Sequence, residues 1–145
     1  MASMELLGVE GVVQSLKHVS PREGKNIARR TITRVAAKVR DDIRSRAPKG
    51  DGTLRKAIKS RRRRGQRGMI EAAVFIEHGP QAKNDAFYWF FLEFGTRFMD
   101  YRPFIYPAVE EWESRVTGEW ARQWWPQFSK EMAKRAKKQA KGVRR

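Results

Sequence analysis

The stretch WFFLEFGTRFMDYRPFIYPAV, residues 89–109, carries eight aromatic rings in twenty-one residues. A small domain without disulfides needs large rings to bury apolar area, at about 25 cal/mol per Å². Gly95 can end one helix and Pro103 can open the next. The stretch therefore predicts a junction at which rings clamp two helices on a small sheet, with any surplus facing a neighbouring subunit. Four phenylalanines at helical spacing are interpreted as core packing: Phe87, Phe90, Phe91 and Phe94.

Upstream of this junction the sequence predicts a long helix and then a β-hairpin. Ser20-Pro21-Arg22-Glu23 is typical of a helix start. Apolar residues at steps of three and four continue the helix to about Arg46, before Ala47-Pro48 stops it. Two extended arms on either side of residues 65–68 then indicate a hairpin, with alternating faces. The stripe expected on the helix is Ala28, Ile32, Val35, Val39 and Ile43, and the apolar face expected on the second arm is Ile70, Ala72, Val74 and Ile76.

Around and beyond the junction, two further helices are predicted. Asp85 can cap a short helix over 86–94, and residues 102–104 open a long C-terminal helix that Pro126 should kink or break. We expect an α+β fold: a small antiparallel sheet with a long β-hairpin, packed by a long helix in the N-terminal half and by a C-terminal helix. The predicted division is one domain over residues 1–126 and a basic helical extension over 127–145.

The formal net charge of +16 is distributed unevenly along the chain. Residues 22–67 carry +14 and residues 130–145 carry +7, whereas residues 68–129 carry −4 and residues 1–21 carry −1. Like charges recur at i, i+4 along the first helix, which costs roughly 0.2–0.5 kcal/mol per pair in isolation. This distribution suggests a polyanionic partner, although a solvated face of a basic protein would have the same composition.

The most basic segment lies on the first arm of the predicted hairpin. Alternate side chains of a strand point to opposite faces, so consecutive arginines cannot all lie on an apolar core. We therefore expect the outer end of the hairpin to project towards a partner or towards DNA. No pattern for reading bases is visible, so any DNA contact should be non-specific and made to phosphates. The candidate contact residues are Arg61, Arg62, Arg63, Arg64 and Arg67.

A second candidate surface lies on the C-terminal helix, where tryptophans are concentrated. Exposed apolar rings are suited to contact with another protein subunit. The candidate subunit interface consists of Trp120, Trp124, Trp125 and Phe128.

Catalysis is the least supported class of function. The chain has no cysteine, its two histidines lie in unrelated segments, and no nucleophile, Walker or zinc-protease motif occurs. Paired carboxylates at Asp41-Asp42 and Glu110-Glu111 are interpreted as solvated helix faces. We predict no catalytic residue, no cofactor and no metal site. No apolar run approaches the length of a membrane span, so no membrane association is expected.

The ordered set of residues at the junction resembles the tail-component family of lambda-like long-tailed phages, proteins of the head-to-tail joining region. An acidic-aromatic-Gly-Thr turn is followed by Pro-Phe and Pro-Ala at a helix start. Upstream, Ala47-Pro48 and Gly52-Thr53-Leu54 are similar to the family pattern, although Gly52 precedes Thr53 here where the family more often has the reverse order. The resemblance spans roughly residues 5–115 and rests on Glu93, Phe94, Gly95, Thr96, Arg102, Pro103, Phe104, Pro107 and Ala108.

The resemblance implies a structural virion protein of the neck or tail end, assembled in the host cytoplasm. It would form a ring with copies of itself, by analogy a hexamer, around the DNA channel and in contact with other neck and tail proteins. Glu93 is expected to pair with Arg97 or Arg102. Two alternatives remain open at this stage: a free, non-specific DNA-binding protein, and a nuclease that uses Asp41 or Asp42.

Overall fold

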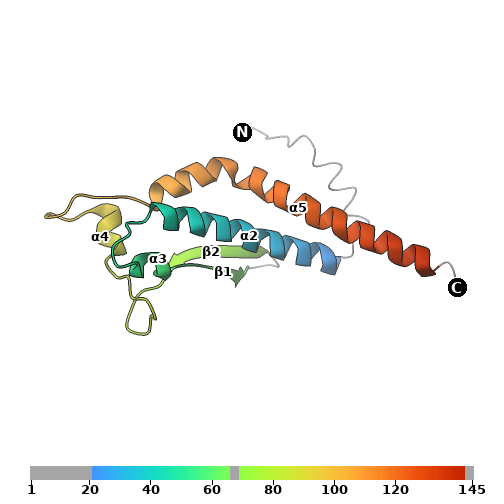
Figure 1. Ribbon diagram of the computed structural model, residues 1–145, viewed down its shortest axis with the longest axis horizontal. Coiled ribbons are helices and arrows are strands. Elements are labelled where there is room, and N and C mark those ends of the chain that lie inside the picture. Colours follow the sequence, from blue (N-terminus) through green and yellow to red (C-terminus); the bar gives the residue numbers. More distant parts are fainter. Residues whose placement is uncertain (1–20, 66–68, 143–145) are drawn as a thin grey trace.

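A computed structural model describes residues 21–65 and 69–142 of the chain (Figure 1). The described part is an elongated α+β molecule, which confirms the predicted class. Helix α2 lies between a two-stranded hairpin and the long helix α5, and it contacts both. The elements in order are α2 (Pro21–Arg46), α3 (Thr53–Ala57), β1 (Ile58–Arg64), β2 (Ile70–Ile76), α4 (Trp89–Phe94) and α5 (Tyr106–Gly142).

Helix α2 begins at Pro21 and ends at Arg46, as its start and stop signals predict. Its buried positions differ from the expected stripe, since Ala28 and Ile32 are only half-buried. A helix that is covered by the hairpin on one side and by α5 on the other buries more than one row of side chains. The fully buried positions are Ile27, Thr31, Val35 and Ile43.

The strands β1 and β2 pair antiparallel, from Ile58 opposite Ile76 to Arg64 opposite Ile70. Val74 and Ile76 pack against the core beneath α2. The described strands lie along α2, so the expectation that the outer end of the hairpin projects freely is wrong for this part of the chain. The alternating faces explain the difference, because the apolar face of β2 holds the ribbon against α2.

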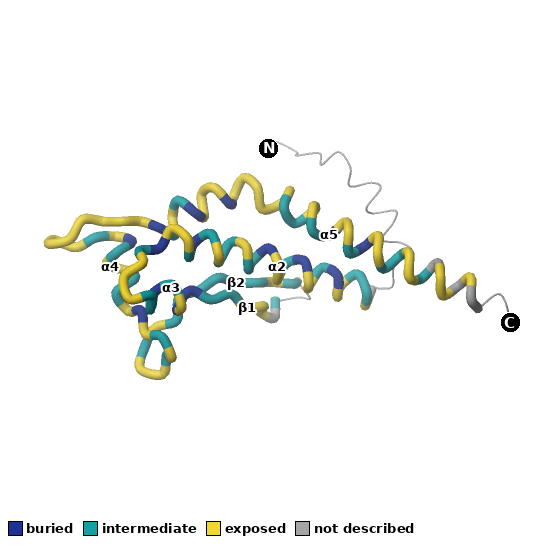
Figure 2. Tube along the Cα trace, in the orientation of Figure 1, coloured by how far each residue is buried: buried dark blue, intermediate teal, exposed yellow. Residues whose placement is uncertain are grey.

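Two buried clusters lie towards opposite ends of α2, within a tube that is otherwise mainly half-buried or exposed (Figure 2). The larger one joins the end of α2, the start of β1 and the start of α5, and its members include Ile43, Ile58 and Phe104. The smaller one packs Ile27 of α2 against Trp124 and Phe128 of α5. Helix α2 therefore connects both clusters and serves as the central support of the fold.

Helix α5 continues through Pro126, so of the predicted kink or break the break is wrong and the kink stays a prediction. A proline inside a helix removes one backbone donor and costs about 3 kcal/mol. Trp124 and Phe128 lie on either side of it, are almost fully buried, and stack with their ring centroids 4.7 Å apart. Packing of this apolar face on Ile27 outweighs the local penalty and keeps the helix continuous.

Candidate anion-binding and assembly surfaces

A basic cleft lies between the first half of α2 and the outer end of the hairpin. Lys25 and Arg29 from α2 face Arg62 and Arg63 from β1 across a hollow of about 600 Å³. The floor also includes Gly65, Met69 and Ile70. The cleft therefore brings together two pairs of cations that are far apart in the sequence.

None of the four cleft cations forms an ion pair with any residue of the described segments 21–65 and 69–142. Cations nearer the other end of the molecule are paired. Lys38 contacts Glu119, and the Lys59 ammonium lies 2.5 Å from Glu77. Glu71 is the cross-strand neighbour of Arg63 but forms no ion pair with it in this part of the chain. Four cations against one nearby carboxylate leave a positive excess, which would attract an external anion.

A second basic groove lies on the other side of α2, against α5. Arg30 and Arg34 line it together with Lys130 and Lys134, and its volume is about 320 Å³. Glu131 lies in the same groove, 3.7 Å from the Lys134 ammonium. The first half of α2 is thus a cationic ridge between two grooves, and a polyanion lying along it would meet both rows of cations.

The remaining arginines predicted as contacts have different positions. The guanidinium of Arg61 lies 4.7 Å from the centre of the Phe75 ring, on the face of the hairpin away from α2. Arg64 ends β1, but its side chain, like the whole of Arg67, lies outside the described residues. Of the five arginines, the structure brings Arg62 and Arg63 to the cleft and directs Arg61 elsewhere.

At the opposite end, Glu93 connects α4 to α5. Its buried carboxylate accepts hydrogen bonds from three backbone N–H groups at the start of α5, those of Phe104 (2.9 Å), Ile105 (3.0 Å) and Tyr106 (2.8 Å). The expected ion pair with Arg97 or Arg102 is wrong. The first N–H groups of a helix have no partner within it, and a carboxylate there also meets the positive end of the helix dipole.

The rest of the junction motif brings Glu93 to this position. Gly95 has φ 74°, and a Cβ there would lie 3.1 Å from the carbonyl oxygen of Met99. Thr96 closes the following turn by accepting the Phe98 N–H with its hydroxyl at 3.2 Å. The Arg102 N–H then donates to the Leu92 carbonyl at 2.7 Å, which returns the chain to α4. Beyond the loop, Pro103 and Pro107 flank the start of α5, where Phe104 and Ala108 are fully buried.

The phenylalanines in and before α4 are exposed, contrary to their interpretation as core. Helix α4 has only six residues and packs on the core through Tyr88, Trp89 and Leu92. The phenylalanine rings of α4 and the rings of the loop to α5 are largely exposed, and Figure 2 shows this end mainly as exposed tube. Phe90 contacts Phe94, and the guanidinium of Arg97 lies 5.8 Å from the centre of the Phe98 ring. The exposed fractions are 64% for Phe87, 50% for Phe90, 43% for Phe91, 64% for Phe94, 92% for Phe98 and 69% for Tyr101.

The predicted tryptophan interface lies mostly within the chain. Trp124 and Phe128 are 3% and 4% exposed in the cluster around Ile27, and Trp120 packs partly against it. Trp125 is 51% exposed. Of the four candidates, Trp125 therefore offers the largest exposed fraction to a partner.

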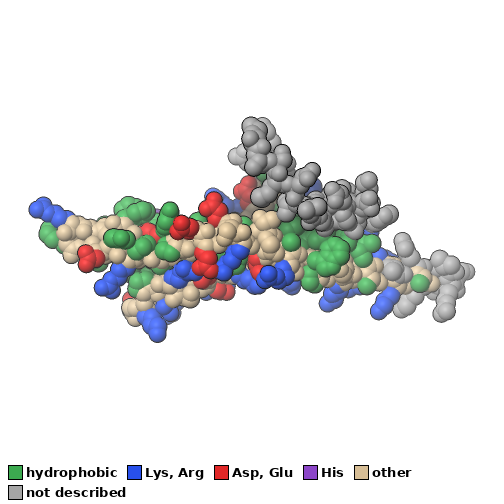
Figure 3. Space-filling view, turned by 90° about the horizontal axis from the view of Figure 1, so that it is seen from above, with side chains coloured by type: hydrophobic (Ala, Val, Ile, Leu, Met, Phe, Trp, Pro, Cys, Tyr) green, Lys and Arg blue, Asp and Glu red, His purple; other side chains and the backbone are tan. Residues whose placement is uncertain are grey.

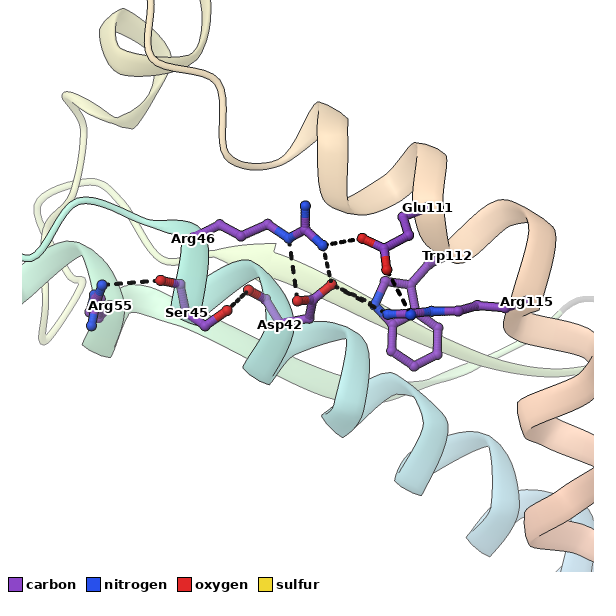
Figure 4. A network of polar contacts seen from close by, with 7 residues as sticks. All are labelled: Asp42, Ser45, Arg46, Arg55, Glu111, Trp112 and Arg115. Carbon is purple, nitrogen blue, oxygen red and sulfur yellow. Dashed lines mark hydrogen bonds and ion pairs between the residues drawn. The ribbon is translucent and has the colours of Figure 1, made fainter.

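The carboxylates considered for catalysis belong to a polar network that joins α2 to α5 (Figure 4). Asp42 accepts the Trp112 indole N–H at 2.9 Å and lies 3.3 Å from Arg46, which also contacts Glu111. The guanidinium of Arg115 lies over the Trp112 ring, 4.4 Å from its centre. Through these contacts Asp42 links α2 to α5, whereas Asp41 is exposed beside Arg40.

Acidic side chains are concentrated over the first half of α5 on the face shown in Figure 3. Among the described residues, no group of three or more His, Asp or Glu side chains is arranged to hold a metal ion. Within the same residues, no helix combines the length and apolarity needed to cross a membrane.

Comparison with known proteins identifies a family. The family model described as "Bacteriophage HK97-gp10, putative tail-component" matches residues 11–95, which is more than half of the chain. The described part of this match extends from α2 to α4 and ends at Gly95, the turn that follows Glu93. Neither a curated protein nor a solved structure matches the chain.

Proposed function

Because the chain belongs to the HK97-gp10-like family of bacteriophage tail components, we propose that it is a structural virion protein of the neck or tail end. It forms a ring, by analogy a hexamer, that completes the tail and helps to join it to the head around the DNA channel. It contacts other neck and tail proteins in the virion, and it assembles in the host cytoplasm.

The observation that carries this proposal is the separation of two kinds of surface along one long molecule. The cationic ridge of α2 with its two grooves lies at one end, and the exposed rings of α4 and the following loop lie at the other. An exposed apolar patch made of several aromatic rings is typical of protein–protein contact, and a cationic ridge is typical of contact with a polyanion. A subunit that binds its neighbours at one end and a phosphate backbone at the other fits a ring around DNA.

The C-terminal segment 127–145 serves in this proposal as a basic extension of the domain formed by residues 1–126. Trp125, at the boundary of the two, is available to a neighbouring protein. The arginines of the hairpin face DNA in the channel and bind phosphates without regard to sequence.

Removal of the gene tests the proposal through particle morphology. We expect filled heads and separate tails that fail to join, and complementation by the wild-type gene should restore joined particles. Normal, infectious particles without the protein would refute the proposal. A double variant with Arg62 and Arg64 both replaced by Glu should complement poorly, and full complementation would remove the assigned role of the arginine arm.

A free, non-specific DNA-binding protein is the alternative that the two basic grooves favour. It predicts tight binding of random duplex by a monomer or dimer, with affinity falling steeply as salt rises. The neck proposal predicts weak DNA binding by the isolated subunit together with self-association or binding to tail proteins. Sedimentation with and without duplex DNA distinguishes the two.

A further inference from the structure

The loop between α4 and α5 protrudes from the end of the molecule and carries Phe98 (Figure 1). The Phe98 side chain is 92% exposed, although the turn that carries it is hydrogen-bonded. Thr96 and Met99 pair across this turn as a short antiparallel bridge, with the Thr96 N–H donating to the Met99 carbonyl at 2.9 Å. A large ring that is almost fully exposed on such a turn is available to insert into another surface.

An apolar hollow of suitable size lies beside the hairpin of the same chain. Its volume is about 310 Å³, and it opens to the surface next to β2. A dry apolar cavity of roughly 150 Å³ already holds benzene, so this hollow can accept a phenyl ring. Its lining includes Ile43, Val74, Ile76, His78, Trp89 and Ile105.

The backbone beside the hollow is also open to a partner. The backbone N–H of Glu77 donates to the Ala57 carbonyl at 2.9 Å, so Glu77 and Ala57 form a hydrogen-bonded pair across the hairpin. Because such pairs alternate in an antiparallel ladder, the N–H and C=O groups of Val74 and Ile76 point away from β1. The described sheet has only two strands, so these groups lie on an edge that can bond to an extended segment.

The exposed rings also provide sufficient area for a stable contact. A fully exposed aromatic side chain offers about 150–250 Å². From their exposed fractions, Phe87 and the five exposed rings of α4 and the loop together present roughly 570–950 Å², a range that includes the ~800 Å² that each partner buries in a specific interface. Both the protruding ring and the hollow are on one chain, so copies of this chain can fill each other's hollows without a third protein.

We propose that the Phe98 loop of one copy inserts into the hollow beside β2 of the next copy. This contact is heterologous: each subunit offers its loop to one neighbour and its hollow to the other, which produces a closed ring or an open filament according to the rotation between subunits. The inference deepens the proposed ring and rests on it, because it names the two surfaces through which the ring closes.

Cysteine cross-linking of the full chain tests the contact directly, because the sequence contains no cysteine of its own. Arg97→Cys and His78→Cys alter one exposed residue beside Phe98 at the loop tip, which keeps the Phe98 ring, and one residue at the rim of the hollow. An equimolar mixture of the two single variants, treated with a mild oxidant, should give a mixed disulfide dimer in preference to either homodimer. The chain that carries both substitutions should give a ladder of covalent oligomers.

The matched control is Glu113→Cys, which is also exposed but lies on α5 about two turns beyond Ile105. Its mixture with Arg97→Cys should cross-link at least about tenfold less. Preferential disulfides between two Arg97→Cys chains would overturn the proposal in favour of a symmetric contact between loops. Equal cross-linking with the control, or a wild-type chain that stays monomeric in sedimentation at cross-linking concentration, would also overturn it.

A variant without cysteine provides the second measurement. Phe98→Glu places a charge on a residue that contributes almost nothing to the core, so the circular dichroism spectrum and thermal midpoint should remain those of the wild type. Self-association should weaken by a factor of about ten or more, as for a central interface ring. Unchanged self-association would refute the contact. Failure of this contact leaves the neck proposal intact, since particle morphology after gene removal tests that proposal separately.

Discussion

The carboxylate of Glu93 accepts a hydrogen bond from the backbone N–H of Tyr106 at 2.8 Å, thirteen residues further along the chain. The same carboxylate accepts from Phe104 and Ile105, so one side chain from the end of α4 caps the start of α5. This side chain therefore fixes where α5 begins and in which direction it leaves the junction.

Replacement of Glu93 by Ala should destabilise the fold by about 2–4 kcal/mol, because it leaves three N–H groups at a largely buried helix start without their acceptor. Urea denaturation followed by circular dichroism measures the change. Glu113→Ala, at an exposed position of α5, serves as control and should cost less than about 0.5 kcal/mol. Equal effects of the two substitutions would contradict the capping role.

Two glycine substitutions should change stability in opposite directions. Gly95→Val forces a β-branched residue to φ 74° with its Cβ 3.1 Å from Met99 and Tyr101 backbone atoms, so we expect a loss of at least about 2 kcal/mol or insoluble protein. Gly118→Ala lies within α5 with nothing within 4 Å of the new Cβ and should gain about 0.5–1 kcal/mol. Thermal melts of both variants check the contrast, and tolerance of valine at position 95 would show that the turn can relax.

The two neighbouring aspartates of α2 should differ in their effect on stability. Asp42→Ala removes the acceptor of the Trp112 indole and a partner of Arg46, so we expect a loss of about 1–3 kcal/mol. Asp41→Ala affects a carboxylate that is 59% exposed and should cost under about 1 kcal/mol. Thermal denaturation measures both. A metal-dependent nuclease activity that either substitution abolishes would restore the enzymatic alternative.

Charge reversal in the basic cleft should weaken the binding of any polyanion while the fold is retained. Arg62→Glu and Arg29→Glu each remove a cation that faces the cleft. The slope of log K against log salt for random duplex DNA should become shallower by roughly one for each phosphate that the variant no longer neutralises. Arg102→Glu, exposed at the aromatic end, is the control of equal charge change. If all three variants bound DNA with the same affinity, net charge alone would explain the binding and the cleft would have no special role.

Acid should weaken the contact between α5 and α2 at Glu119. Hydrogen bonds from Gln123 and Lys38 hold the pKa of this carboxyl below its ordinary range. A carboxyl whose pKa is lower in the folded state stabilises the fold at pH values above its pKa in the unfolded chain, about 4.3. That contribution disappears as pH falls from there through the folded value. The thermal midpoint of Glu119→Gln should therefore fall less steeply between about pH 5 and 3 than that of the wild type, by about the effect of one titrating group. An equally steep fall in both proteins would show that Glu119 does not contribute to the acid sensitivity.

Local signals in the sequence predicted most of the elements. Pro21 starts α2 and Gly95 ends α4, because each residue determines the backbone at its own position. Pro126 misled the prediction, since the packing of Trp124 and Phe128 that keeps α5 continuous depends on Ile27, which lies far earlier in the chain.

The functional surfaces were less predictable for a different reason. Helical spacing shows which rings share a face but not whether anything covers that face, so Phe90 and Phe94 were expected in the core and are exposed. The partners of Glu93 are backbone amides, which have no sequence signature, and arginine side chains were the natural expectation. The arginines of β1 could be recognised, whereas their meeting with Lys25 and Arg29 depends on how the hairpin lies on α2.

The two buried clusters at opposite ends of α2 have a consequence for the order of assembly. The two clusters share no residue, and the smaller one, built on Ile27, Trp124 and Phe128, has fewer buried residues to hold it closed. Amide hydrogen exchange should therefore be faster around it than around Phe104. A subunit with one firmly folded end and one end that opens readily can dock first through the firm end and complete its structure only when its neighbours are in place.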